Sequence, residues 1–247
     1  MEEKTSVKKN AADLLDKALS LHARKNRYGF IVLASSTDPY LQMEENMQVT
    51  RKCLEVILKY KFPVHIITKS SLVKRDFDLL KKIDKVAILP EDLKGKISGT
   101  LITFSFSSID PGSGKIFESG APSPSERLLT MKSASESGFL TGVSLMPLLP
   151  FISDTDEQLE KMISSFANYG AKYIMPAGLT LFGNSTSDSR TLTLDKIKTY
   201  YPQLLTEYEK LFSSHDYPSN EYSARINSIT NSIIKKYSLR NRILPLS

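Results

Sequence analysis

The sequence is poor in cysteine and tryptophan and has no long apolar run. Its 247 residues include one cysteine, Cys53, no tryptophan and three histidines. A single thiol excludes an internal disulfide framework, a cysteine-based zinc site and an iron–sulfur cluster held by this chain alone. The longest apolar stretch, residues 143–152, is too short and too rich in proline to cross a bilayer. The sequence does not open on a signal-peptide pattern, so we expect a soluble, cytoplasmic protein that does not contact a membrane.

With 40% hydrophobic and 24% charged residues, the composition is typical of a protein with a large folded core. The length fits one barrel-sized domain or two small ones. The formal net charge of +6 lies at the two ends, because residues 1–27 and 220–247 are rich in Lys and Arg. Such basic termini attract nucleic-acid phosphates, but they are also common as simple solvated ends. Nucleic acid is therefore one possible partner.

Short apolar runs alternate with amphipathic segments over most of the chain. The strands predicted from this pattern are 30–34, 63–68, 100–106, 141–149 and 172–182, with 86–89 as a possible sixth. The predicted helices are 11–20, 49–60, 72–81, 125–137 and 155–169, followed by 194–212 and 222–237. Alternation of this kind predicts an α/β fold, here an incomplete parallel (β/α) barrel. We expect the barrel core to span 1–190 and a helical C-terminal extension, 191–247, to pack on it.

Polar residues follow several of the predicted strands. Serine, threonine and aspartate end the first run at 35–38, Lys69 ends the second, and Ser105 lies in the third, which is followed by Ser107 and Ser108. Ligands bind at the carboxyl ends of parallel strands, so these side chains should converge. Lys69 suits a ligand carboxylate, and Asp38 or nearby oxygens suit an ammonium group. The pattern predicts a ligand that carries both groups.

Each of these residues also has a structural interpretation. Asp38 precedes Pro39 and is an ordinary turn starter, and serine or threonine after a strand often caps the next helix. Lys69 has no such capping role, since positive charge is disfavoured at a helix N-terminus. The three histidines lack metal-ligand spacing, and Cys53 falls within a predicted helix as a small core residue.

Several motifs in order resemble the radical SAM proteins of the spore photoproduct lyase type. They are SSTDPYLQMEEN, Thr50-Arg51, HIITKSSLVKRDFDLL, FESGAPSPSERL and SLMPLLPFISDTDEQLE. The resemblance implies a partial barrel of six parallel βα units, of which this chain supplies about five, with S-adenosylmethionine bound across the strand tips.

The resemblance also implies a set of cofactor-binding residues and leaves the catalytic residue unassigned. The segment containing Thr37 matches the part that touches the methionine ammonium, Lys69 matches the lysine that holds the carboxylate, and Ser105 matches a serine near that end. Glu118 and Arg127 match residues near the cofactor and the mouth of the active site. The full set is Ser36, Thr37, Asp38, Lys69, Ser105, Glu118 and Arg127.

Two departures from this family bear on activity. Its members carry a CxxxCxxC loop that ligates a four-iron four-sulfur cluster, and that motif is not in this sequence. Residues 5–20 resemble what directly follows the loop, so the family implies a cluster that this chain cannot ligate alone. The lyase also has a hydrogen-donating cysteine where Ser35 or Ser36 falls, which argues against repair of spore photoproduct.

These observations leave three functional hypotheses open. The chain is part of a split or truncated enzyme whose cysteine-bearing strand comes from a partner polypeptide that fills an exposed parallel sheet edge. Alternatively, it is a non-catalytic protein that binds S-adenosylmethionine or nucleic acid, or it is an inactive gene remnant. The substrate class, whether DNA, RNA or protein, is not encoded in any motif of the sequence.

Overall fold

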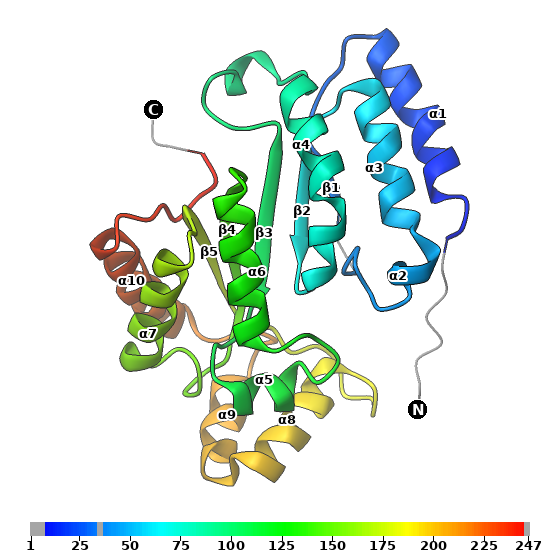
Figure 1. The fold of residues 1–247 in the computed structure, drawn as a ribbon. Coiled ribbons are helices and arrows are strands. Elements are labelled where there is room, and N and C mark those ends of the chain that lie inside the picture. Colours follow the sequence, from blue (N-terminus) through cyan, green and yellow to red (C-terminus); the bar gives the residue numbers. More distant parts are fainter. Residues whose placement is uncertain (1–7, 34–36, 245–247) are drawn as a thin grey trace. The chain divides into compact units, whose positions relative to one another are not determined.

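Parallel strands alternate with helices in the computed structural model, which describes residues 8–33 and 37–244 (Figure 1). The five strands form one parallel sheet in the order β1-β2-β3-β4-β5. Their bounds are β1 Ile31–Leu33, β2 Val64–Thr68, β3 Thr100–Phe106, β4 Leu140–Leu148 and β5 Tyr173–Gly178. This arrangement confirms the predicted α/β class and the incomplete parallel barrel.

Helices connect the strands, and further helices follow the last one. The α-helices are α1 Ala11–Arg24, α2 Glu44–Met47, α3 Val49–Tyr60, α4 Phe77–Val86, α5 Pro111–Phe117, α6 Pro124–Glu136, α7 Asp156–Asn168, α8 Ser189–Tyr200, α9 Leu205–Leu211 and α10 Asn220–Lys236. Three short 3₁₀ segments are η1 Ser71–Asp76, η2 Glu91–Leu93 and η3 Pro202–Leu204. Side chains cap several of these helices; for example, the Thr155 hydroxyl accepts a hydrogen bond from Gln158 N at 3.3 Å.

The residues group into two compact units. The first unit is Met1–Thr103 with Ser137–Leu140, and the second is Phe104–Glu136 with Thr141–Ser247, so β3 contributes to both. Within the first unit, α1 packs on α3 and α3 packs on α4 (Figure 1). Helix α3 buries Leu54 and Ile57, a helical spacing that places both on one face.

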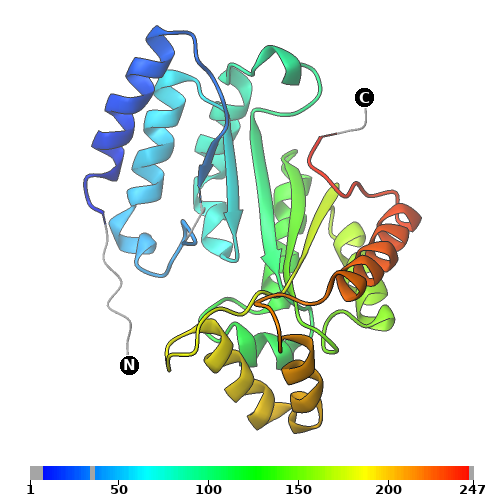
Figure 2. The ribbon, with the colours of Figure 1, turned by 180° about the vertical axis from the view of Figure 1, so that it is seen from behind.

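Within the second unit, α10 packs against α7 and β5 (Figure 2). One core cluster joins residues after the ends of β4 and β5 to α8 and α9, and it comprises Leu149, Leu179, Leu181, Ile197, Tyr208 and Phe212. The backbone around Arg240 runs beside the start of β5, where Ile174 N donates to Arg240 O at 2.8 Å. The chain's own C-terminal segment therefore covers part of this sheet edge.

Several predicted elements were wrong in their boundaries. The predicted helix 72–81 begins as the 3₁₀ segment η1 before α4, and 86–89 forms no strand, because Val86 ends α4. The predicted strand 172–182 ends at Gly178, and Leu181 N bonds instead to Asp216 O. The predicted helix 194–212 breaks at Pro202, which lacks an N–H for the helical ladder.

Candidate functional site

Asp38, in the loop after β1, joins that loop to the end of β2. Its Oδ1 accepts hydrogen bonds from Tyr40 N at 2.9 Å and from the Thr68 hydroxyl at 2.7 Å. Its Oδ2 accepts from Lys69 N at 2.7 Å. The structure thus brings Asp38 and Lys69 together, as predicted, but through the lysine backbone. The carboxylate organises the loop, which is the structural role that an Asp-Pro turn predicts.

Lys69 stands directly after β2 and its side chain is half-buried. The next residue, Ser70, accepts a hydrogen bond from Leu72 N and begins η1, so the strand turns away immediately after the lysine. Thr37 is exposed in the loop after β1, and Ser36 lies outside the described residues. A lysine at this strand end has the charge to pair with a ligand carboxylate.

A buried network of charged residues supports the same loop and was missed at the sequence level. Glu44, only 5% exposed, accepts hydrogen bonds from Val49 N and Thr50 N at the start of α3. Arg75 Nη2 bridges Glu44 at 3.0 Å and the fully buried Asp76 at 2.8 Å. These bonds fix the positions of α2, α3 and η1 relative to the loop.

The signal for this network was in the sequence, inside two of the quoted motifs. Glu44 belongs to SSTDPYLQMEEN, and Arg75 and Asp76 belong to HIITKSSLVKRDFDLL. Arg51, the second residue of the Thr50-Arg51 pair, joins Asp76 at 2.7 Å and Asp78 at 3.2 Å. Local pattern alone predicts that such charged residues are solvated, because burial of an ion pair is set by the fold.

In the second unit, the structure brings together the other three predicted residues. Arg127, on α6, is 1% exposed, and its Nη1 donates to the backbone oxygen of Ser105 at 2.8 Å. Its Nη2 donates to Glu118 Oε2 at 2.6 Å. The guanidinium lies over the ring of Phe106, 5.0 Å from the ring centre. Arg127 therefore ties α6 to β3 and to the segment after α5.

Two polar atoms near the end of β3 are buried and have no partner among the described residues. They are the Ser107 hydroxyl and Arg127 Nε. Buried polar atoms are nearly always hydrogen-bonded in native proteins, to protein, water or ligand. The Ser107 hydroxyl follows β3 and can both donate and accept a hydrogen bond, so it is a polar group available to water or to a ligand at this strand end.

The described residues do not fit an iron–sulfur cluster. Cys53 is buried in α3, and burial raises the pKa of its thiol, which disfavours the thiolate that a cluster needs. Over residues 8–33 and 37–244 there is no group of three or more His, Cys, Asp or Glu that could hold a metal ion. In the same part of the chain, no helix is long and apolar enough to span a membrane.

Comparison with solved structures identifies the fold. Spore photoproduct lyase, in a variant with bound AdoMet and dinucleoside spore photoproduct, superposes with a TM-score of 0.63 over 92% of this chain and 64% of that chain, at 14% identity. The chain has the fold of spore photoproduct lyase. Streptococcus suis SuiB bound to S-adenosylmethionine matches with a TM-score of 0.51 over 84% of this chain and 43% of that one, at 12% identity. Both are radical SAM enzymes, so the family resemblance predicted from the motifs is confirmed at the level of the fold.

Sequence comparison finds relatives that carry no described function. An uncharacterized protein of Mycobacterium tuberculosis is 24% identical over 209 residues, covering 85% of this chain and 57% of the relative. An uncharacterized protein of Acidianus two-tailed virus is 29% identical over 188 residues, covering 74% of this chain and 58% of the relative. No family model matches the chain. The chain thus spans less than two thirds of the length of these relatives and of the lyase.

Proposed function

We propose that this chain is the S-adenosylmethionine-binding part of a radical SAM enzyme whose cluster cysteines lie on a segment outside these 247 residues. The observation that carries the proposal is the fold, shared with spore photoproduct lyase over 92% of the chain. The solved lyase binds AdoMet, and SuiB binds S-adenosylmethionine. The cofactor, once bound beside a cluster, supplies the radical chemistry of such enzymes.

In this proposal the residues of the chain bind and orient the cofactor. The Lys69 ammonium pairs with the methionine carboxylate, and the backbone of Lys69 is held in place by Asp38. Glu118 and Arg127 act by fixing the end of β3, because their ion pair is buried against it.

Calorimetric titration of S-adenosylmethionine into the purified chain tests cofactor binding. We expect saturable binding that Lys69→Ala weakens about tenfold or more, since a charge-assisted hydrogen bond is lost. Lys74→Ala is the matched control, because Lys74 is exposed in η1 nearby, and its binding should equal that of the wild type. Absence of binding to the wild type, or equal binding by all three proteins, would overturn this part of the proposal.

The cluster-bearing segment should pair with the outer edge of β1. Residue Ile31 donates its N–H to Pro63 O in the direction of β2, so the backbone groups of Val32 point the other way, and Val32 is 48% exposed. No described residue pairs with that side of β1. An uncovered edge of this kind accepts an added strand through main-chain hydrogen bonds.

Co-expression with a cysteine-bearing segment, such as a neighbouring reading frame, tests this pairing. We expect a brown complex with iron–sulfur absorbance that Val32→Pro abolishes, since proline removes the outward N–H. Val32→Thr is the control, because it keeps that N–H at the same exposed position, and it should retain the complex. A colourless pair that does not associate would contradict the partner hypothesis.

A further inference from the structure

The carboxyl-terminal ends of α1, α3 and α4 lie together at one end of the first unit (Figure 1). The rings of Tyr28, which follows α1, and Phe62, which follows α3, are 4.8 Å apart between centres. After α4, Ile88 N donates a hydrogen bond to Lys61 O at 2.8 Å. These contacts join the three helix ends into one surface at the amino ends of β1 and β2.

Exposed cations from α1 and α3 gather on this surface. Arg24 ends α1, Lys25 and Arg27 lie in the turn after it, and Lys61 directly follows α3. All four side chains are exposed. None of them forms an ion pair with a residue in the described part of the chain.

Helix α4 and the segment before β3 add further lysines to the same surface. Lys81 and Lys85 are four residues apart on α4, so they share one face of the helix. Lys96 lies in the segment before β3, which returns to α4 where Thr100 N donates to Asp84 Oδ1 at 2.8 Å. The three lysines are exposed, and no ion pair joins them to described residues. Together with the four cations of α1 and α3, they form what we call the basic end.

Few carboxylates oppose this charge. Residues 24–27 and 59–62 contain none, and residues 81–99 contain Asp84, Glu91 and Asp92. Asp84 accepts the backbone hydrogen bond from Thr100, and Glu91 is ion-paired with Lys94. Positive charge therefore remains in excess at the basic end and is available to an anionic partner.

Local helix stability explains only part of this charge. Arg24 and Lys85 lie in the last turns of their helices, where cations interact favourably with the helix dipole. Arg27 and Lys96 lie outside any helix. Lys61 has a φ of 59°, a left-handed conformation at a helix end that usually takes glycine or asparagine. The backbone does not call for a lysine at this position.

The other side chains of this end narrow the chemistry of the partner. The described residues that form it include no exposed aromatic ring on which an unpaired base could stack. Its exposed apolar side chains are Val86 and Ile88, which are 40% and 37% exposed. Since more than half of each is covered, they offer little apolar area for insertion into a lipid surface. The surface is suited to phosphates.

We propose that the basic end binds the phosphate backbone of double-stranded DNA without reading its bases. Adjacent packed helices lie about 8–10 Å apart, so the three helix ends span about 20 Å, or roughly six base pairs at ~3.4 Å each. Lys61 precedes β2, whereas Lys69 follows it, so this surface lies at the opposite end of the strand from the proposed cofactor contact. The assignment is independent of cofactor binding.

Fluorescence anisotropy with the full chain and two short DNA duplexes of equal length and unrelated sequence tests the proposal. We expect equal binding of the two duplexes and a slope of log K against log salt of about −4 to −6, as roughly five to seven phosphate contacts give. A single strand of the same length should bind more weakly. No binding of either duplex, preference for one sequence, or tighter binding of the single strand would overturn the proposal.

Two further probes distinguish DNA from other polyanions. Vesicles containing phosphatidylserine should sediment no protein at salt concentrations at which the duplex is bound, and binding to vesicles but not to the duplex would overturn the proposal. An RNA duplex that bound more tightly than DNA would show recognition of 2′-hydroxyl groups and would overturn the assignment to DNA.

The variant Lys81→Gln/Lys85→Gln/Lys96→Gln tests the location of the surface. It should weaken duplex binding about tenfold or more at constant salt and make the salt slope shallower by about 1 for each lysine removed. Glutamine and lysine have similar helix propensities, so the variant should fold, which thermal unfolding checks. Unchanged affinity and slope would overturn the proposal.

The matched control removes the same charge from exposed helical positions of the second unit. Lys161→Gln/Lys198→Gln/Lys210→Gln should bind the duplex as the wild type does. Equal weakening in the two triple variants would show an effect of net charge alone and would overturn the assignment to the basic end.

A second pair of substitutions tests whether the helix ends act as one surface. Arg24→Gln/Arg27→Gln alters the end of α1 and should also weaken duplex binding, and wild-type affinity in this variant would contradict a shared surface. Titration with S-adenosylmethionine should be unchanged in it. Conversely, Lys69→Ala should bind the duplex as the wild type does, so failure of cofactor binding and failure of DNA binding are separate results.

Discussion

Single buried charges hold the loop that follows β1. Glu44 lies at the centre, because it caps α3 through Val49 N at 2.9 Å and Thr50 N at 3.0 Å and also pairs with Arg75. A buried charge that loses its partner is costly to a folded protein. At this scale the structure depends on interactions that no local sequence pattern reveals.

Glu44→Ala should therefore destabilise the protein strongly. Arg75 and two helix N–H groups lose their acceptor, and we expect the free energy of unfolding to fall by about 3–5 kcal/mol. Urea unfolding of the variant and the wild type measures this difference in the free energy of unfolding. Glu45→Ala is the control, since Glu45 is exposed, and it should stay within about 0.5 kcal/mol of wild type. Equal losses in the two variants would contradict the role of Glu44.

His65 makes the stability of the first unit depend on pH. Its side chain is 6% exposed on β2, its Nε2 lies 2.6 Å from the Thr103 hydroxyl, and burial lowers its pKa to about 4. The unfolded chain binds a proton near pH 6.5 and the folded chain does not. The stability contributed by neutral His65 is therefore present above pH 6.5 and is lost as the pH falls toward 4.

Between pH 7 and pH 5 this loss should reach about 2 kcal/mol. The measurement compares urea unfolding of wild type and His65→Gln at the two pH values, so that the common contribution of the carboxylates cancels. The variant should show a smaller pH dependence by that amount. His22→Gln, at an exposed position on α1, should retain the wild-type dependence, and an identical dependence in His65→Gln would refute the assignment.

At the scale of elements, the two edges of the sheet differ in whether another described segment of the chain pairs with them. The start of β5 is covered by the chain's own residues around Arg240, whereas the outer side of β1 has no partner among the described residues. Edges left open in this way are usually blocked or paired. This difference favours β1 as the place where a further strand is added.

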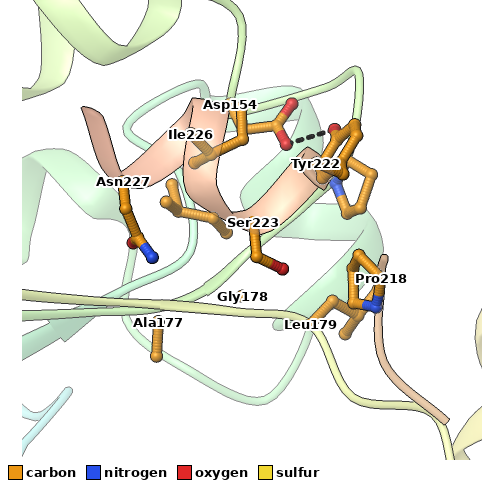
Figure 3. A pocket seen from close by; sticks show the side chains of 11 residues that line it. Asp154, Ala177, Gly178, Leu179, Pro218, Tyr222, Ser223, Ile226 and Asn227 are labelled. Atoms are coloured by element: carbon orange, nitrogen blue, oxygen red, sulfur yellow. Dashed lines mark hydrogen bonds between the residues drawn. The ribbon is translucent and has the colours of Figure 1, made fainter. Parts of the chain in front are cut away.

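The first turn of α10 is held by one hydrogen bond to the loop after β4 (Figure 3). Burial raises the pKa of Asp154, and the Tyr222 hydroxyl that donates to it opposes that rise. Tyr222→Phe removes the donor and should lower the free energy of unfolding by about 1–3 kcal/mol. Hydrogen exchange should also become faster in the first turn of α10.

Tyr237→Phe is the control for this experiment. The Tyr237 hydroxyl donates to Glu160, which is ion-paired with Lys236 at the surface, so its loss should cost less than about 1 kcal/mol. If Tyr222→Phe cost no more than Tyr237→Phe, the buried bond would have no special role in holding the helix.

At the scale of the whole molecule, the chain combines a radical SAM fold with a single buried thiol. Reconstitution of the purified chain with iron and sulfide under anaerobic conditions should yield no stable cluster, because ligation needs several thiolates. Iron and sulfide analysis with visible absorbance measures this. A four-iron content that Cys53→Ala removes would contradict the prediction.

The sequence alone determined the fold class and the order of elements, because apolar periodicity and capping residues act locally. It predicted the five strands, and it predicted that Asp38 and Lys69 would lie close together, since both follow strands that end at the same edge. The motif order also predicted the resemblance to radical SAM enzymes that the fold confirms. These features depend on short stretches of chain and on the rules of parallel sheets.

Only the tertiary structure decided which polar groups are buried and what they contact. It turned Asp38 into a backbone acceptor, joined Glu44 to Arg75 across 31 positions, and buried Arg127 against Ser105 and Glu118. It also broke the predicted helix 194–212 at Pro202 and gathered the basic end from the ends of three helices. Burial and long-range pairing depend on how distant segments pack, so their energies are fixed by the fold and not by neighbouring residues.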